Sequence, residues 1–308
     1  MSYRPPDEQT LKDLEASAIG LAQGAGKILS QYIAGNTEVS YKGKGETDPV
    51  TEADLRVEEY LREEITREFP EHGIVSEENT ENTQHDADFK WVLDPIDGTA
   101  NFAAGVPFYA ISIGLLHTGV PVVSSLFLPN TFAGNGVYHA RLGSGAFADE
   151  TPLKVAESPR PQPTGLVGMP AGFARSLSFR RERGRGLGDV RVMGSIACEM
   201  VMVAGGLLQY SLIGAPRIWD VAAGVLLIKV AGGQILERKS GEWIPLQEFT
   251  APPQRPNETP SQALRRWGSP LLLGPPAMLA YLAPRIRFRR RLSSYLPRRI
   301  RAILSGRR

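Results

Sequence analysis

The residues best suited to chemistry lie in one segment, WVLDPIDGTANF, at residues 91–102. A run typical of a strand delivers Asp94 and Asp97, three residues apart across a predicted turn, so that two carboxylates converge at a bend. At Gly98 and Thr99 the chain can enter a short helix, whose first amides and positive dipole end would stabilise a phosphate oxygen. Because carboxylates repel an anion unless a cation lies between them, these features together indicate a hard divalent metal such as Mg²⁺.

Three more acidic residues could join this pair. Glu77 and Glu78 end the segment GIVSEE, and Asp220 lies in IWDVAAG, where it would open a helix. Taken singly, each acid has an ordinary structural explanation. Asp220 suits the first turn of a helix, the two glutamates suit a solvated loop, and the aspartates of DPID suit a turn. Occurring together, they favour a shared site for a cation.

The joint pattern resembles the inositol monophosphatase family of Mg²⁺-dependent, lithium-sensitive phosphatases, within the wider group that includes fructose-1,6-bisphosphatases. The resemblance extends from a helix beginning near Leu11 to about Leu282. It implies a layered α/β/α/β/α sandwich, of the α/β class, and a phosphomonoesterase that uses Mg²⁺. The motifs that carry it are DPVTEAD (48–54), GIVSEE (73–78), WVLDPIDGTANF (91–102) and IWDVAAG (218–224).

The resemblance also implies roles for individual residues. The amides of Gly98 and Thr99 would bind the phosphate, and the Asp54 carboxylate would accept a hydrogen bond from the Thr99 hydroxyl. Thr99 and Glu77 would orient or deprotonate the attacking water. Metal ions that activate this water and neutralise the phosphate make a His, Cys or Ser nucleophile unnecessary. The implied metal ligands are Glu77, Asp94, the backbone carbonyl of Ile96, Asp97 and Asp220.

Asp54 also has a purely structural explanation. The segment from Thr51 to Asp54 resembles a capping box, in which the side chain serves the first amides of a helix predicted over 52–69. The sequence leaves both roles open, and the family resemblance favours the catalytic one. The other acids of this helix are interpreted as its solvated face: Glu58, Glu59, Glu63, Glu64 and Glu68.

The sequence indicates the type of reaction more narrowly than the identity of the substrate. In the inositol-selective members of the family, a glutamate seven residues before the aspartate of the WD pair contacts the inositol hydroxyls, and here that position is Ile213. The turn over 193–196 resembles the substrate-contacting turn of the family and supplies Gly194 and Ser195 as candidate contacts, while Arg217 adds a cation nearby. The expected substrate is a small phosphorylated metabolite. Inositol monophosphate, another sugar phosphate, histidinol phosphate and a 3′-phosphonucleotide such as 3′-phosphoadenosine phosphate stay open.

Hydrophobic periodicity places these residues on predicted elements. Three- and four-residue spacing predicts helices over 11–35, 52–69, 195–208 and 218–230. Apolar runs predict strands over 73–76, 90–93, 165–168, 191–193 and 234–237, a hairpin over 109–128 and a strand near 136–140. Residues 43–50 are predicted to form a loop. We therefore expect an α+β half over 1–156 that holds the metal and phosphate site, an α/β half over 157–284 and an Arg-rich tail over 285–308.

The net charge of +2 conceals a basic C-terminal end. Residues 259–308 hold 12 of the 35 basic residues and no acid, so the other 23 basic residues are outnumbered by 33 acidic ones. The tail contains ten Arg, with apolar residues spaced roughly as a helix face. It could bind an anionic membrane or nucleic acid, cover the acidic body within one chain or across a homodimer, or form a solvated extension. A second class of function is therefore a recruited binding protein with a vestigial phosphatase site.

Composition excludes several other classes. With 308 residues, 42% hydrophobic and 22% charged, the chain lies in the ordinary globular range, and its apolar runs fall short of the roughly 20 residues of a spanning helix. The polar segment 1–10 lacks the apolar stretch of a signal peptide, so we expect a cytoplasmic protein, at most peripheral to a membrane. Cys198 is predicted to be buried. The four histidines, at 72, 85, 117 and 139, show no ligand spacing and are expected at surface or hairpin positions.

Overall fold

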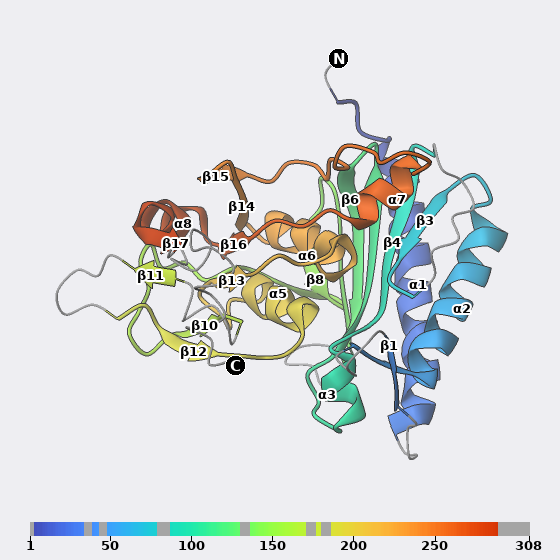
Figure 1. The fold of residues 1–308 in the computed structure, drawn as a ribbon, viewed down its shortest axis with the longest axis horizontal. Coiled ribbons are helices and arrows are strands. Elements are labelled where there is room, and N and C mark those ends of the chain that lie inside the picture. The colour runs from blue at the N-terminus through green and yellow to red at the C-terminus, as the bar shows by residue number, and fades with distance from the viewer. Residues whose placement is uncertain are drawn as a thin grey trace, which may run out of the picture.

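The computed structural model describes residues 3–33, 39–42, 48–78, 87–129, 136–170, 177–179 and 186–288. These residues form five layers, in which two sheets are separated and flanked by helices (Figure 1). The helical layers are α1 (Glu8–Ile33) with α2 (Glu52–Glu68), then α5 (Ile196–Ala204) with α6 (Ile218–Val230), and then α8 (Pro276–Leu282). The expected α/β/α/β/α arrangement is confirmed.

The larger sheet lies between the first two helical layers and has seven strands, which follow one another across the sheet in chain order (Figure 1). β3 and β4 pair in parallel, and each later pair is antiparallel. The strands are β3 (Gly73–Ser76), β4 (Phe89–Asp97), β5 (Ala110–His117), β6 (Val120–Phe127), β7 (Val137–Arg141), β8 (Ala146–Ala148) and β9 (Thr151–Pro152). The hairpin predicted over 109–128 is present as β5 and β6, and helix α3 (Thr99–Ala103) follows β4 almost directly.

The second sheet has six strands, in the order β12, β10, β13, β16, β14 and β15. The first three pair in parallel and the others antiparallel. Their bounds are β10 (Leu166–Gly168), β12 (Asp189–Arg191), β13 (Ser211–Ile213), β14 (Gln234–Lys239), β15 (Glu242–Pro245) and β16 (Leu271–Gly274). Because this sheet begins after residue 165 and the larger one ends at Pro152, we propose two halves that divide near residue 156.

Two predictions from local pattern are wrong in detail. Asp48–Thr51, expected to end a loop, forms β2 and pairs with β1 (Val39–Lys42). Phe288, expected on a helix face of the tail, lies in β17 (Ile286–Phe288), which pairs with β11 (Leu177–Phe179). Such short strands depend on hydrogen bonds to a partner strand, which local periodicity does not reveal. Residues 43–47 and 289–308 lie outside the described residues, so the rest of the predicted loop and tail receive no structural account.

Helix α6 is covered on both sides, and its apolar residues are buried almost without interruption. It lies very close to β5, because a Cβ built on Gly114 would come within 2.9 Å of the backbone nitrogen of Ala223. The hydroxyl of Ser112, also on β5, donates to the carbonyl of Trp219 at 3.2 Å. These contacts fix the start of α6, where Asp220 lies, against the larger sheet.

The outer helix α1 is amphipathic, as its spacing predicted. Its buried face packs on the larger sheet and consists of Leu11, Leu14, Ala18, Leu21, Ala22, Ala25 and Leu29. Among the described residues, no helix combines the length and the apolar character needed to cross a membrane.

Two histidines are less exposed than the sequence suggested. The Nδ1 atom of His139 lies 2.8 Å from the Glu15 carboxylate of α1, and only 15% of the His139 side chain is exposed. His72 stacks on the ring of Phe89, with 4.8 Å between the ring centroids. His139 lies in the hairpin of β7 and β8, one of the two positions expected for the histidines, and it contacts α1 through Glu15. His85 lies outside the described residues. The prediction of a buried thiol at Cys198 is confirmed.

Candidate active site

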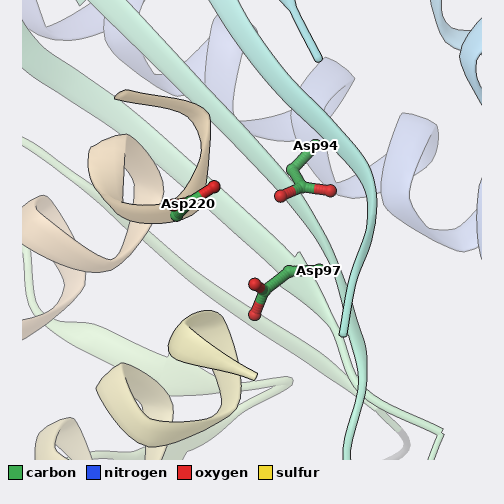
Figure 2. Close-up of side chains that lie close together, drawn as sticks. All are labelled: Asp94, Asp97 and Asp220. Atoms are coloured by element: carbon green, nitrogen blue, oxygen red, sulfur yellow. The ribbon is translucent and has the colours of Figure 1, made fainter. Parts of the chain in front are cut away.

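Three of the predicted metal ligands meet in the space between β4 and α6. Asp94, Asp97 and Asp220 each offer a carboxylate oxygen, and these oxygens all lie within 4.8 Å of one another. Figure 2 shows the three side chains pointing toward a common space, two from the strand and one from the start of the helix. The structure thus brings together residues that are more than 120 positions apart in the chain.

The predicted turn between Asp94 and Asp97 is wrong, because both residues belong to the single strand β4. In a regular strand, residues three apart face opposite sides. Here the pairing with β5 shifts its register between Asp94 and Asp97, and such a bulge turns the second carboxylate toward the same side as the first. Pro95, which has no amide hydrogen to donate, is compatible with this interruption. The irregular strand therefore achieves the convergence that a turn was expected to provide.

Asp97 is held by the helix that follows the turn at 193–196. Its Oδ2 atom accepts a hydrogen bond from the Ser195 hydroxyl and another from the backbone amide of Ala197 at 2.6 Å. The same Ser195 oxygen accepts a hydrogen bond from the Cys198 amide at 3.1 Å, so Ser195 is the N-cap of α5. These bonds fix one carboxylate of the larger sheet to the central helical layer.

Asp220 is fixed within the first turn of α6. Its Oδ2 atom accepts a hydrogen bond from the backbone amide of Arg217 at 2.8 Å. The structural explanation considered for Asp220, a first-turn acid, therefore holds, and its position beside Asp94 and Asp97 is compatible with a ligand role as well. Arg217 is the N-cap residue of the helix, and its positive charge lowers the pKa of Asp220 slightly against larger opposing effects.

The three carboxylates lie among like charges, with Asp94 and Asp97 buried and Asp220 half-buried. Burial raises the pKa of Asp94 well above its usual range, and the negative charges of Glu77, Asp97 and Asp220 raise it further. Burial, with the charge of Asp97, raises the pKa of Asp220 to about 8. Burial also raises the pKa of Asp97 to about 6, although hydrogen bonds from α5 oppose the shift. The Oδ1 atom of Asp94 is buried and has no hydrogen-bond partner within the described part of the chain. The three carboxylates are therefore expected to bind either protons or a cation.

Glu77 lies in the loop after β3, close enough for its charge to act on Asp94 and Asp220. The loop is held from one side by Glu58 of α2, which accepts a hydrogen bond from the Ser76 hydroxyl at 2.7 Å and one from the Glu78 amide at 3.0 Å. Glu58 is 3% exposed, so its assignment to a solvated face is wrong. Its burial reflects the loop contact, which helix periodicity alone does not show.

Arg265 holds the same loop from the other side. This residue ends α7 (Pro260–Arg265), and its guanidinium donates to the backbone carbonyls of Ser76 and Glu77. The guanidinium also lies over the ring of Trp219, 4.9 Å from the ring centroid, which is a favourable cation–π arrangement. One side chain therefore connects the Glu77 loop with the residue that precedes Asp220. No motif in the sequence pointed to it.

We expect Arg265→Met to weaken Mg²⁺ binding roughly 10-fold, the lower end of what loss of a supporting contact costs a metal site. The measurement is the Kd for Mg²⁺, obtained from the dependence of the Tm on Mg²⁺ concentration. Arg266→Met is the matched control, because Arg266 binds Glu258 at 2.7 Å and not the Glu77 loop. An equal effect of the two substitutions would contradict the positioning role of Arg265.

Asp54 makes the contacts that both of its predicted roles require. Its Oδ2 atom accepts hydrogen bonds from the amide and hydroxyl of Thr51, in a complete capping box. Its Oδ1 atom lies 3.1 Å from the Thr99 hydroxyl, which is also 3.0 Å from the carbonyl of Ile96. The two oxygens of one carboxylate thus serve the helix and Thr99 separately. The expected hydrogen bond between Thr99 and Asp54 is present.

The candidate phosphate-binding residues lie at the start of α3. Gly98 is the N-cap residue with φ of 96°, a left-handed conformation that favours glycine, and a Cβ there would lie 3.0 Å from the carbonyl oxygen of Phe108. The amide group of Asn101 donates to the carbonyls of Phe108 and Met193, at 2.6 and 2.8 Å. This side chain places the turn that contains Gly194 beside α3.

A pocket of about 430 Å³ adjoins the acidic group and shares Asp220 with it. Gly194 and Ser195 line it, but the Ser195 hydroxyl already bonds Asp97 and the Cys198 amide. Glu199 lines it as well, and the sequence analysis did not single this residue out. The signal in the sequence that could have indicated Glu199 is its position as a single acid within an otherwise apolar helix.

Comparison with known proteins agrees with this site. The family described as "Inositol monophosphatase family" matches residues 10–265. An inositol-1-monophosphatase of Mesorhizobium japonicum is 33% identical over 228 residues, 72% of this chain and 84% of that protein. A protein of Xylella fastidiosa named Nus factor SuhB is 30% identical over 234 residues, 72% of this chain and 80% of its own length.

A solved structure of an IMPase/NADP phosphatase, complexed with Mg²⁺ and phosphate, shares the fold with a TM-score of 0.70. It is 20% identical, and the match covers 89% of this chain and 95% of that one. A chain with this fold and this family match is a phosphatase, a phosphoric monoester hydrolase. It belongs to the inositol monophosphatase family.

Proposed function

We propose that this protein is an Mg²⁺-dependent phosphomonoesterase that hydrolyses a small phosphorylated metabolite. The observation that carries the proposal is the convergence of Asp94, Asp97 and Asp220 near the start of α3, with Asp94 and Asp97 buried and Asp220 half-buried. Carboxylates in this arrangement repel one another and attract a divalent cation. A phosphate ester placed beside them needs the same cation to offset its own charge.

The donor atoms suit Mg²⁺. Carboxylate and carbonyl oxygens are the ligands that a hard cation prefers, and the unpartnered Oδ1 atom of Asp94 offers one directly. When bound, Mg²⁺ lowers the pKa of a coordinated water and neutralises charge on the phosphate. The residues that would hold it are Glu77, Asp94, Ile96 through its carbonyl, Asp97 and Asp220.

The side chains around Thr99 would prepare the water. The Thr99 hydroxyl donates its proton toward Asp54, which leaves its lone pairs to accept a hydrogen bond from the water. Glu77 would take a proton from the water as its oxygen adds to phosphorus. The bond from phosphorus to the leaving oxygen then breaks, and that oxygen takes a proton from solvent. The amides of Gly98 and Thr99, at the start of α3, would hold the phosphate.

A phosphate-release assay tests this proposal directly. We expect Mg²⁺ to support phosphate release from at least one ester in a panel of inositol monophosphate, a hexose phosphate, histidinol phosphate and 3′-phosphoadenosine phosphate. Chelation with EDTA should lower the rate at least about 100-fold, and added Mg²⁺ should restore it. A rate that EDTA does not change would contradict the metal assignment, and no release from any ester would contradict the phosphatase assignment.

We also propose partners beyond the substrate. The protein would be a cytoplasmic homodimer. The ten Arg in residues 285–308 support its attachment to an anionic membrane surface or to nucleic acid. The relative named Nus factor SuhB supports a role in addition to hydrolysis.

A further inference from the structure

Glu199 is a buried carboxylate for which the phosphatase chemistry has no use. It lies on α5, is 6% exposed and lines the 430 Å³ pocket that adjoins Asp220. The hydroxyl of Ser211, on β13, donates to its Oε2 atom at 2.8 Å. Because the side chain is held from the second sheet, its carboxylate has a fixed place at the wall of the pocket.

The backbone nearby leaves room for this carboxylate. A Cβ built on Gly168, in β10, would come within 2.6 Å of the Glu199 Oε2 atom and 2.5 Å of the Ser211 hydroxyl. Any larger residue at this position would displace the acid from its place. The carboxylate therefore lies against the backbone of β10, between the central helices and the second sheet.

The rest of the pocket offers little to a polar ligand. Within the described residues, its charged side chains are those of Glu199 and Asp220, and Asp220 belongs to the proposed metal site. Two donors of the protein reach the Glu199 carboxylate, the Ser211 hydroxyl and the backbone amide of Met193, and burial still raises its pKa to about 7. The apolar lining consists of Pro170, Val192, Ile196, Ile213, Ala215 and Pro216.

The pocket is placed to receive the leaving group of the substrate. It shares Asp220 with the acidic group, and its wall includes Gly194 and Ser195, the latter bonded to Asp97. A phosphate ester with its phosphorus beside the three aspartates and α3 can extend its organic part into this space. Ile213 also lines the pocket but has no acceptor to offer a substrate.

We propose that Glu199 binds the leaving group, by accepting a hydrogen bond from a hydroxyl or a protonated amine carried on an otherwise apolar body. This inference rests on the proposed phosphatase function and narrows its substrate class. A polyol with many hydroxyls would leave several donors without partners in an apolar pocket, which weakens its binding. A phosphomonoester with one donor remote from the phosphate fits better.

The test uses three linear alkyl monophosphates of equal length, ending in a methyl, a hydroxyl or an ammonium group. With Mg²⁺ present, kcat and KM are measured for the wild-type protein, Glu199→Gln and Glu199→Leu. We expect the wild-type protein to prefer one or both of the donor-bearing esters over the methyl ester by roughly 10-fold to 100-fold in kcat/KM, mainly through KM. Glu237→Gln is the matched control, because Glu237 is a carboxylate of β14 that is 3% exposed and does not line the pocket.

The two substitutions separate the two kinds of donor. A glutamine keeps a carbonyl that can accept from a hydroxyl but has no charge for an ammonium group. An ammonium preference should therefore disappear in both variants, whereas a hydroxyl preference should persist in Glu199→Gln and disappear in Glu199→Leu. Circular dichroism and the Tm of each variant show whether it is folded.

The outcomes distinguish this inference from the function on which it rests. Equal turnover of all three esters by the wild-type protein, or a preference that both variants keep, would overturn the role of Glu199 and leave the phosphatase intact. Loss of methyl-ester turnover in the variants together with the donor preference would assign Glu199 to the fold and overturn the binding role. Wild-type protein that releases no phosphate from these esters or from the metabolite panel would overturn both proposals.

Discussion

Asp94→Asn is expected to abolish phosphate release, lowering kcat at least about 10³-fold, while the protein stays folded. The amide keeps the shape of the side chain but replaces one carboxylate oxygen with a group that cannot bind a cation. Burial and neighbouring charges raise the pKa of Asp94 well above its usual range, so a bound cation would favour the charged form of this carboxylate. Steady-state rates with saturating Mg²⁺ give the measurement, and a variant with near wild-type kcat would contradict the metal assignment.

Thermal unfolding of the same variant supplies a second readout. Because the native pKa values of Asp94, Asp97 and Asp220 lie above their unfolded values, the metal-free native state binds more protons than the unfolded state between about pH 4 and pH 8. The free energy of unfolding of the metal-free protein should therefore fall as the pH rises through this range. Asp94→Asn should make that fall shallower and raise the metal-free Tm at pH 8, with little change near pH 4.

Mg²⁺ should stabilise the wild-type protein but not Asp94→Asn. A ligand that binds only the native state stabilises it, by about 2.7 kcal/mol at 100 times its Kd. At pH 8 we expect Mg²⁺ to raise the Tm of the wild-type protein by several degrees and to leave that of Asp94→Asn nearly unchanged. A wild-type Tm that is indifferent to Mg²⁺ would contradict the proposed site independently of any assay of turnover.

Thr99→Val and Thr99→Ser form the second pair of expected results. Valine removes the hydroxyl at nearly constant volume, so we expect kcat to fall about 10²-fold to 10⁴-fold, the usual effect of losing a proton-handling group. Serine keeps the hydroxyl within reach of Asp54 and Ile96, and we expect at least a tenth of the wild-type rate. Steady-state kinetics on any active ester of the panel measures both.

Asp54→Asn provides the control for this pair. With its carbonyl oxygen in the place of Oδ2, the asparagine can still accept the hydrogen bonds that cap α2, but its NH2 group then faces Thr99 and cannot accept a hydrogen bond from the hydroxyl. A rate that falls with α2 stability unchanged would separate the catalytic contribution of Asp54 from its capping role. Equal activity of Thr99→Val and Thr99→Ser would show that the hydroxyl has no part in the reaction.

Much of the site could be predicted because its acids lie in short contiguous motifs. The DPID segment and the helix start at Asp220 carry strong local signals, and the two helices of the outer layer follow from spacing of apolar residues. The bulge in β4 could not be predicted, since it depends on the pairing of that strand with β5. The local sequence pattern predicts a turn between Asp94 and Asp97, whereas the pairing of β4 with β5 makes this segment an irregular strand.

The supporting residues were missed for a different reason. Glu58 and Arg265 have no motif of their own, and their roles come from contacts with a loop that lies far away in the sequence. Glu199 was overlooked because a helix that is buried all round gives no periodic signal by which to judge a single acid. Residues that position the catalytic groups are in this sense harder to predict than the groups themselves.

The order of strands in the second sheet has a consequence for how the chain folds as it is made. β16 lies between β13 and β14, although it is the last of the six strands to be synthesised. The seven-stranded sheet uses continuous sequence and can form while the chain emerges, as domains generally do. The second sheet cannot be completed at that stage. Until β16 is synthesised, the facing edges of β13 and β14 have no partner strand. A nascent chain that ends before Leu271 would thus carry every proposed catalytic residue yet lack the strand that joins the two parts of that sheet.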